Sequence, residues 1–571
     1  MAKTATQRGG GRVRLGAISY MPGSMFDLVM ASVFINVLSL ALPLALLQVY
    51  DRIIPNQSKS TLVLLIAGVG TALVLEVLLR IGRAYVSGWM GARFEHMAGC
   101  AAMERLLNAS ITDFERNGTG VHLERLNALS MLKEFYSGQA ILVLCDLPFA
   151  VIFLGVIAYL ADELVLVPVV LIVLFAITAL ITGRLLRGAL AARMTADDRR
   201  FNFIIEVLGG IHTVKSMAME AQMLRRYERL QETCAGTDFD VAFRSSSAVT
   251  VGTVFSQMTL FTVVGVGATM VIDGMLTIGG LAACTMLAGR AMQPMQRAVG
   301  IWTRFQTIRL ARDRLRKVFE IPLEAPPGLP KLPPVNGEVV IDNVSFRYRD
   351  DLPQILDGAT MHVRAGEAVG ICGGNASGKT TLLYMLMGAM RPQEGRVSID
   401  GNDLSEYDPA SLKEQIAYLP QHGVLFNGTI MENITMYRAD RVQAAEEVST
   451  LLGLDKAVAH MPQGYNTRVG QGAHDSLPRG IKQRIAVARA LVDKPHILLF
   501  DEANSAMDST GDAYMRGLLE QLKGRCSIVL VTPRPSMLRL ADRIYDLQGG
   551  RLTERRPDPP VAGIESAETP A

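Results

Sequence analysis

The chain has 571 residues and a nearly balanced charge, with 57 Lys and Arg against 54 Asp and Glu and a formal net charge of +3. That balance argues against a protein that binds nucleic acid through bulk charge. Hydrophobic residues make up 49%, charged residues only 19%, and the mean hydropathy is +0.25, which excludes a disordered chain and argues against an ordinary soluble enzyme.

The six Cys are isolated in the sequence, with no CxxC pair, so neither a disulfide scaffold nor a structural zinc site is expected. The length suggests several domains, because single hydrophobic cores stop growing near roughly 250–300 residues.

Residues 1–25 form a basic N-terminal segment. It does not resemble a cleavable signal, because Arg8, Arg12 and Arg14 are followed by a Gly-containing stretch and not by a short apolar core. Six apolar runs follow, each long enough to cross a hydrocarbon core about 30 Å thick, which needs roughly 17–25 helical residues. The predicted spans lie near 26–50, 61–83, 139–160, 164–184, 248–272 and 275–293.

Lys and Arg gather in the N-terminal segment and in two long polar stretches, 84–138 and 185–246, whereas the other loops are short. Because cytoplasmic loops carry the excess of positive charge, we predict that the N-terminus and both long stretches are cytoplasmic. Each stretch is long enough for a helical hairpin reaching roughly 35–40 Å beyond the membrane. The candidate hairpin tips lie near Asn117–Glu124 and Gly209–Val214.

Charges within predicted spans mark either function or a buried pair. Glu76 and Arg80 are spaced i,i+4 on the second span, so we expect them to pair with each other. Asp146 stands two residues before Pro148 and could face a cavity or compensate for the proline kink.

The composition changes after the spans. A Pro-rich linker at 321–336 follows the predicted transmembrane domain of 26–320. Residues 337–555 then alternate strand-like and helical runs, as in a soluble α/β domain. A tail at 556–571, rich in Pro, Ala and Glu, is predicted to be disordered.

One segment of the α/β domain fits the phosphate-binding pattern GxxxxGK[ST]. An apolar run precedes it and a helical run follows, which is the strand–loop–helix context that a P-loop requires. Backbone N–H groups of such a loop hold phosphate at a helix N-terminus. The alternative is a Gly-rich turn that matches by chance. The predicted phosphate-binding residues are Gly373, Gly374, Asn375, Ala376, Ser377, Gly378, Lys379, Thr380 and Thr381.

A second apolar run, Ile497–Phe500, ends in Asp501 and Glu502. Downstream of a P-loop, Asp501 is placed to hold Mg²⁺ and Glu502 to orient or deprotonate the attacking water. Lys379 would reach the β- and γ-phosphates, and the Thr380 hydroxyl would hold Mg²⁺. The alternative is a strand end with two solvated acids.

Together these residues resemble the ATP-binding-cassette (ABC) family, and further positions match in order. The resemblance implies that Tyr348 stacks on adenine, that Gln421 belongs to a glutamine loop that senses Mg²⁺, and that Asp508 lies in a loop crossing between two cassettes. The corresponding structural alternatives are an aromatic on a strand face, an exposed loop amide and a helix N-cap. ATP and Mg²⁺ are the implied ligands, with Glu502, Lys379 and Gln421 as catalytic residues.

Six spans ahead of one cassette resemble an ABC exporter half-transporter over roughly residues 20–555. The fold class implied is multidomain, with an all-α six-helix transmembrane domain followed by an α/β P-loop cassette. The segments PLALLQVYD, DFERNGTG, TVKSMAM and MLAGRAMQP are similar to the haemolysin-type permease/ATPases of type I protein secretion.

Two motifs depart from the family pattern. Where the family has LSGGQ, this chain has Leu477–Ile481, with Pro478 and Arg479 in place of the serine and glycine that contact the γ-phosphate of the partner cassette. Where the family has a switch histidine, this chain has Pro533. Proline has no N–H to donate, so we expect reduced hydrolysis, while Glu502 keeps hydrolysis possible.

The resemblance implies an ATP-binding exporter subunit in the inner membrane, with its cassette in the cytoplasm and a polypeptide as cargo. It implies either a homodimer or, the preferred reading, a heterodimer with a second ABC half-transporter. A membrane-fusion protein, an outer-membrane channel and membrane lipid are further implied partners, and nucleic acid is not. The alternatives are an ATP-binding regulatory subunit with little hydrolysis and an exporter of lipid or small amphiphiles.

Overall fold

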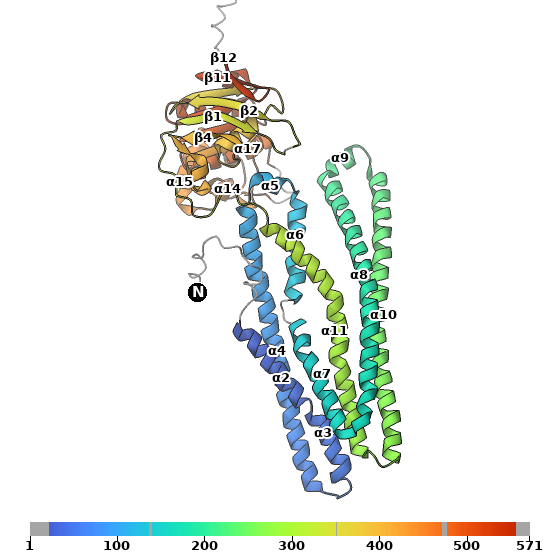
Figure 1. Ribbon diagram of the computed structural model, residues 1–571. Helices are drawn as coiled ribbons and strands as arrows, with labels where there is room; N and C mark the ends of the chain where they lie inside the picture. Colours follow the sequence, from blue (N-terminus) through green and yellow to red (C-terminus); the bar gives the residue numbers. More distant parts are fainter. Residues whose placement is uncertain (1–21, 136–139, 350, 471–476, 556–571) are drawn as a thin grey trace, which may run out of the picture. The chain divides into compact units, whose positions relative to one another are not determined.

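The computed structural model describes residues 22–135, 140–349, 351–470 and 477–555 (Figure 1). Most of the predicted basic N-terminal segment and the whole predicted tail lie outside these residues. The described chain divides into two compact units. A helical unit contains the residues up to Leu107 and Asn117–Ile321, and a cassette unit contains Asn108–Arg116 and the residues from Pro322 onward.

Long helices make up the helical unit. In chain order its elements are α2 (Pro22–Leu38), α3 (Ala41–Gln48), the π-helical turn η1 (Val49–Ile53), α4 (Lys59–Leu107), α6 (Thr119–Glu134), α7 (Ala140–Ala161), the 3-10 turn η3 (Asp162–Val165), α8 (Leu166–Gly209), α9 (Ile211–Ser216), α10 (Glu220–Ile272) and α11 (Ile278–Phe319). In Figure 1, α8 and α10 run side by side over most of their length, and they pack against each other.

Among the described residues, four helical stretches are long and apolar enough to cross a membrane: Met25–Ile53, Lys59–Leu107, Cys145–Gly209 and Glu220–Ile272. The third stretch contains most of α7 and the whole of α8, so it overlaps two of the predicted spans. The predicted sixth span lies mostly within α11, which does not meet the same criterion over its described residues. Gly, Thr and Arg290 dilute the hydropathy of that segment.

The first predicted span is not one continuous helix. It is interrupted by a turn at Ser39–Leu40 and widens into the π-helical turn η1 at its end. Within η1, Asp51 accepts hydrogen bonds from the Thr277 hydroxyl at 2.6 Å and the Gly279 amide at 2.9 Å. Asp51 therefore satisfies the free N–H of Gly279 at the start of α11 and joins two spans that are far apart in the sequence.

The second predicted hairpin tip lies at a turn between helices, whereas the first does not. Gly209–Val214 lies at the turn from α8 into α9. The first hairpin turns earlier than expected, because α4 ends at Leu107 and the short helix α5 (Ile111–Glu115) follows, whereas Asn117–Glu124 contains the start of α6. The α5 segment belongs to the cassette unit, where the Ser110 amide donates to the Pro322 carbonyl at 3.0 Å.

Three sheets build the rest of the cassette unit. A four-stranded sheet has the order β2-β1-β4-β5, a six-stranded sheet has the order β12-β11-β3-β10-β9-β6, and β7 pairs with β8. The strands are β1 (Val339–Phe346), β2 (Leu356–Val363), β3 (Ala368–Cys372), β4 (Glu394–Ile399), β5 (Asn402–Asp403), β6 (Ile416–Leu419), β7 (Gly428–Thr429), β8 (Arg468–Val469), β9 (Ile497–Asp501), β10 (Ser527–Val531), β11 (Arg543–Gln548) and β12 (Arg551–Arg555).

The strands β11, β3, β10, β9 and β6 are parallel, so their carboxyl ends share one edge of the sheet. The helices that follow α5 in the cassette unit are α12 (Lys379–Leu386), α13 (Pro409–Gln415), α14 (Ile430–Thr435), α15 (Val442–Leu451), α16 (Leu454–Ala459), α17 (Arg479–Leu491), α18 (Ser509–Leu522) and α19 (Pro535–Leu538), with 3-10 turns η4 (Leu404–Glu406), η5 (Ala439–Arg441) and η6 (Gly464–Asn466). Of these, α12, α13 and α17 contact strands of the sheet, and α14, α15 and α16 pack against α17.

The side chains of the central strands alternate between two hydrophobic cores. Leu499 and Val529 enter one core, whereas their neighbours Phe500 and Ile528 enter the other. Successive residues of a strand point to opposite faces, so a strand buried on both faces is apolar throughout. Burial on both faces fixes the register of β9 and β10. It thereby fixes where Asp501, at the end of β9, lies relative to the end of β10.

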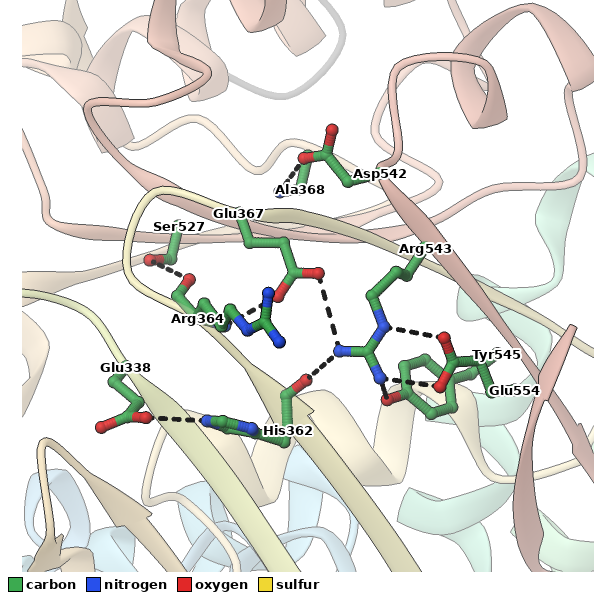
Figure 2. Close-up of polar contacts among 10 residues, drawn as sticks. All are labelled: Glu338, His362, Arg364, Glu367, Ala368, Ser527, Asp542, Arg543, Tyr545 and Glu554. Carbon is green, nitrogen blue, oxygen red and sulfur yellow. Dashed lines mark hydrogen bonds and ion pairs between the residues drawn. The ribbon is translucent and has the colours of Figure 1, made fainter. Parts of the chain in front are cut away.

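A polar cluster ties the last hairpin to the rest of the cassette (Figure 2). Arg543 donates to both Glu554 oxygens at 2.8 Å and to the His362 carbonyl at 3.0 Å, and its guanidinium lies 3.6 Å from Glu367. It therefore connects β11 with β12, with the end of β2 and with the turn before β3. Figure 2 also shows Asp542 accepting from the Ala368 amide, at 3.0 Å.

Candidate functional site

The predicted P-loop connects β3 to α12. Gly378 has a φ of 101° and Ala376 a φ of 59°, a left-handed backbone that favours glycine at the first of these positions. A Cβ on Gly373 would lie 2.7 Å from the Leu547 carbonyl oxygen, whereas a Cβ on Gly374 would meet nothing within 4 Å. The loop is thus packed on its inner side and open on its outer side, as a phosphate cradle requires.

Among the described residues, the Lys379 and Ser377 side chains have no hydrogen-bond partner outside the loop. The Lys379 ammonium donates to the Gly373 and Gly374 carbonyls at 2.9 and 2.7 Å, so its charge is held over its own loop. The Ser377 hydroxyl is buried and has no hydrogen-bond partner among the described residues. A buried hydroxyl without a partner costs free energy, and a phosphate oxygen in the cradle would satisfy both groups.

The acidic end of β9 lies at the same edge of the sheet. Val531 of β10 pairs with Ile371 of β3 on one side and with Asp501 of β9 on the other. The P-loop and Glu502 therefore leave the sheet at the same level. This register follows from parallel pairing and brings together residues that are more than a hundred positions apart in the sequence.

Asp501 is buried, and the Tyr418 hydroxyl donates to it at 3.0 Å. Burial, together with the neighbouring Asp501 carboxylate, raises the pKa of Tyr418 well above its usual range. The tyrosine thus remains a hydrogen-bond donor at any physiological pH and fixes one carboxylate oxygen.

Glu502 is held in an unusual backbone conformation, with a φ of 47°. Its amide donates to the Val531 carbonyl at 2.9 Å, which keeps the residue in this left-handed region despite the steric cost. The Gln421 amide donates to the Glu502 carboxylate at 3.1 Å. The structure therefore joins two predicted catalytic residues that lie on different loops.

The backbone of the glutamine loop is held by Gln483, a residue that was not predicted from the sequence. Gln483 of α17 is buried, donates to the Pro420 carbonyl at 2.7 Å and accepts from the Gly423 amide at 2.8 Å. These two bonds bracket Gln421. A lone glutamine in a helix carries no sequence signal for this role.

Tyr348 lies against the first turn of α12. Its hydroxyl and the Thr381 hydroxyl are 3.0 Å apart, and its ring meets Phe346 edge to face at 5.2 Å. The aromatic ring therefore stands beside the P-loop helix with part of its surface already packed, and its stacking on adenine stays a prediction.

Asp508 caps α18 and accepts from the Gly511 amide at 2.8 Å. This is the helix-cap alternative left open by the sequence. Arg484 of α17 lies 3.6 Å from the same oxygen. The loop Ser505–Asp508 is thus anchored at its end, and a role for Asp508 towards a second cassette stays a prediction.

Both departures from the family pattern lie at exposed ends of elements. Pro478 is the N-cap of α17 and has no capping side chain to offer, and Arg479 occupies the first helical position. Both residues are exposed, as is Pro533. The neighbouring segment Gln471–Ala473, whose spacing also differs from the family, lies outside the described residues.

The segment after Pro533 is tied to the loop that follows Glu502. The Arg534 guanidinium and the amide of buried Asn504 both donate to Asp512 Oδ1, at 2.8 and 2.6 Å. Asn504, Asp512 and Arg534 were not predicted, because three polar residues on three elements form no local motif.

A metal ion would have a mixed set of oxygen donors here. No group of three or more His, Cys, Asp or Glu that could hold a metal is found among the described residues. The Thr380 hydroxyl, the Asp501 carboxylate and the Gln421 amide fit Mg²⁺, which keeps several waters and substrate phosphates and needs few protein ligands.

Two family models match the chain: "ABC transporter transmembrane region" over residues 25–295 and "ABC transporter" over residues 356–505. The chain is 32% identical to the alpha-hemolysin translocation ATP-binding protein of Escherichia coli, over 93% of this chain and 75% of that protein. It is 31% identical to the exotoxin translocation ATP-binding protein of Pasteurella aerogenes, over 93% and 74%, and 30% identical to the cyclolysin secretion/processing ATP-binding protein of Bordetella pertussis, over 92% and 74%.

A solved bacterial Atm1-family ABC exporter with ATP bound shares the fold. The TM-score is 0.79 at 23% sequence identity, over 93% of this chain and 94% of that one. The predicted fold class, a helical transmembrane domain followed by an α/β cassette, is therefore confirmed.

Proposed function

Since this chain belongs to the ABC transporter family, as a half-transporter whose membrane region precedes its ATP-binding cassette, we propose that it powers the export of a polypeptide in a type I secretion system. It is a multi-pass membrane protein with an ABC-type ATPase cassette. The named relatives translocate or secrete protein toxins, which supports a polypeptide cargo here. The inner membrane, with the cassette in the cytoplasm, is the proposed location.

One observation carries the proposal: the P-loop and the pair Gln421–Glu502 leave the same edge of one parallel sheet. ATP would lie with its phosphates against the backbone N–H groups of Gly374–Gly378, and Lys379 would turn from its loop carbonyls to the β- and γ-phosphates. Tyr348 would stack on adenine, and Thr381 would position Tyr348 through their shared hydrogen bond.

Mg²⁺, when bound by Thr380, Asp501 and Gln421, supplies positive charge that offsets the charge of the phosphates. Tyr418 holds Asp501 in place. Glu502 would orient the attacking water and accept its proton, and the Gln421 amide would keep the Glu502 carboxylate turned towards that water. The remaining binding role, that of Asp508, lies towards a second cassette.

Hydrolysis is expected to be slow in this chain alone. Pro478, Arg479 and Pro533 replace groups that would contact the γ-phosphate, and loss of one positioned polar group typically costs roughly 10²–10⁴ in rate. We therefore propose a heterodimer with a second, complete ABC half-transporter in preference to a homodimer. A membrane-fusion protein and an outer-membrane channel are the further proposed partners.

The two prolines also favour a second candidate, an ATP-binding regulatory subunit that closes on ATP and hardly hydrolyses it. The full chain in nanodiscs separates the two. An exporter subunit should bind Mg-ATP and show a slow turnover that Glu502→Gln abolishes. Binding with no turnover above the Glu502→Gln background, alone or with a complete homologue, would favour the regulatory subunit. Absence of Mg-ATP binding by the intact chain would refute both.

A further inference from the structure

Two helices of the helical unit that pack against each other, α4 and α11, each carry a stripe of arginine on one face. Glu76, Arg80 and Arg83 are spaced i, i+4 and i+7 on α4, so they lie on one face of that helix. Arg290 and Arg297 are seven positions apart on α11 and likewise share a face. Since α11 packs against α4 and α7, the two stripes and Asp146 of α7 belong to one charged cluster.

Asp146 is the centre of the first half of this cluster. Its Oδ2 lies 3.1 Å from an Arg297 nitrogen, and its Oδ1 accepts from the Asn36 amide at 2.8 Å and lies 3.8 Å from Arg83. The side chains of Asp146 and Arg83 are 7% and 12% exposed, so this carboxylate is enclosed by α2, α4, α7 and α11. The fold therefore already contains a slot in which arginines hold a carboxylate.

The second half of the cluster has more cations than anions. Glu76 is buried and accepts two hydrogen bonds from Arg80, at 2.6 and 2.9 Å. Arg290 is half-buried and interacts electrostatically with both Glu76 and Arg80. Within the part of the chain that the structure describes, the Arg290 guanidinium has no ion pair or hydrogen bond of its own.

The cluster thus contains Arg80, Arg83, Arg290 and Arg297 against Glu76 and Asp146, an excess of two positive charges. Charges within membrane-spanning helices are costly and persist where they pair or line a path for polar cargo. A half-buried guanidinium that makes no hydrogen bond or ion pair with the described residues offers a position for an anion.

From this geometry we infer that the cluster is a binding subsite for carboxylate groups of the transported chain, and that Asp146 occupies the subsite when no cargo is present. Arg290 and the exposed part of Arg297 receive an acidic side chain of the cargo. The inference rests on the proposed polypeptide cargo and names one chemical feature of it. A carboxylate is favoured over a lipid phosphate because the slot between Arg83 and Arg297 is built around one and is enclosed by four helices.

The test uses the full chain in nanodiscs of neutral phosphatidylcholine. The probe is a short fluorescent glutamate peptide, and a glutamine peptide of equal length is the reference; affinity is read from anisotropy. We expect the glutamate peptide to bind more tightly, with an affinity that falls as salt rises. Arg290→Gln should weaken this binding about tenfold, and Arg290→Lys should retain most of it. Arg229→Gln, at an exposed arginine of α10, is the matched control and should change nothing.

Asp146→Asn should change the affinity for the glutamate peptide in the opposite direction to Arg290→Gln. Removing the resident carboxylate frees Arg83 and Arg297, so the glutamate peptide should bind more tightly, whereas a purely structural ion pair would give weaker or unchanged binding. If Asp146→Asn misfolds, the Arg290 variants still decide the question.

Equal affinity for the two peptides, or no effect of Arg290→Gln, overturns the inference. So does an Arg290 effect that is confined to the retention of phosphatidylglycerol by the protein, because it would assign the site to lipid. Mg-ATP binding and ATPase activity are measured on the same samples. Normal nucleotide behaviour with no preference for the glutamate peptide would refute the subsite alone, whereas loss of nucleotide binding in the unmodified chain would refute the proposed function.

Discussion

Pro533 is a direct departure from the family pattern, because it stands where the family has the switch histidine. It is exposed between buried Thr532 and half-buried Arg534, at the end of the strand that holds the Glu502 amide. It has neither an N–H nor a polar side chain. The backbone around it is nonetheless ordered by the bond from the Arg534 amide to the Thr532 hydroxyl, at 3.2 Å. A polar side chain could therefore be restored here without rebuilding the loop.

We predict that Pro533→His raises the ATP turnover of the full chain by about tenfold to a hundredfold. This is below the full effect expected of a positioned acid–base group, because Pro478 and Arg479 remain altered. Pro535→His, two residues further on and also exposed, is the control and should leave the turnover unchanged. The gain should vanish when Glu502→Gln is added, and a gain that survives that addition would show that it does not come from this site.

At the scale of elements, the Asp512 carboxylate joins three pieces of the cassette: the loop after β9, the first turn of α18 and the segment after β10. We predict that Asp512→Ala destabilises the cassette by about 1–3 kcal/mol, because it leaves the amide of buried Asn504 without its acceptor. Asp512→Asn keeps an acceptor and loses only an ion pair to Arg534, whose side chain is 36% exposed, so its cost should stay below about 1 kcal/mol.

The measurement for Asp512 is the midpoint of the cassette's thermal transition in the full chain. Asp440→Ala, at an acid whose side chain is 73% exposed, serves as the reference for losing a surface carboxylate. If Asp512→Ala shifts the midpoint no more than Asp440→Ala does, the three-way contact contributes nothing to stability.

The β11–β12 hairpin should make the cassette sensitive to acid. A hydrogen bond from Arg543 lowers the pKa of Glu554. Burial alone would raise the pKa of Asp542, but hydrogen bonds from Lys523 and the Ala368 amide lower it overall. A carboxylate with a lowered folded-state pKa stabilises the fold above its unfolded pKa and loses that contribution as the pH falls through the folded value. Since unfolded Asp and Glu titrate near about pH 4, stability should fall from about pH 4 downward.

Thermal midpoints measured between neutral pH and about pH 3.5 check the hairpin prediction. Glu554→Gln cannot titrate, so its midpoint should fall less steeply on acidification than that of the unmodified chain. Arg551→Gln, which removes a surface ion pair of the same hairpin to Asp357, should keep the original slope. Identical slopes for Glu554→Gln and the unmodified chain would contradict the assignment.

Features formed by residues close together in the sequence could be predicted, whereas features formed by residues far apart could not. The P-loop could be predicted because its chemistry lies in consecutive residues, and the Glu76–Arg80 pair because helical geometry places residues four apart together. The partners of Asp146 could not, since Arg83 and Arg297 come from helices whose packing no local pattern specifies. The same holds for Gln483 beneath Gln421 and for the break in the first span. Features that depend on tertiary register were found only from the structure.

At the scale of the whole molecule, the altered residues determine what pairing can achieve. In a homodimer both nucleotide sites would combine this P-loop with Pro478 and Arg479, and both would lack the switch histidine. In a heterodimer one site would regain a complete signature loop, and the other would regain a histidine. Each site of the mixed pair would thus lack fewer groups than each site of the homodimer.

We therefore predict that the full chain, purified together with a complete ABC half-transporter, turns over ATP at least about tenfold faster than the chain alone, since each restored polar group is worth roughly 10²–10⁴ in rate. Native mass measurement should show one copy of each subunit. Lys379→Ala in this chain should lower the turnover of the mixed pair, which excludes an excess of active partner homodimer as the source. Recovery of homodimers only, under conditions in which both chains are present in the same membrane, would contradict the heterodimer. Pro478 and Pro533 would then occur in both sites of a homodimer, which we would expect to close on ATP and to reopen slowly.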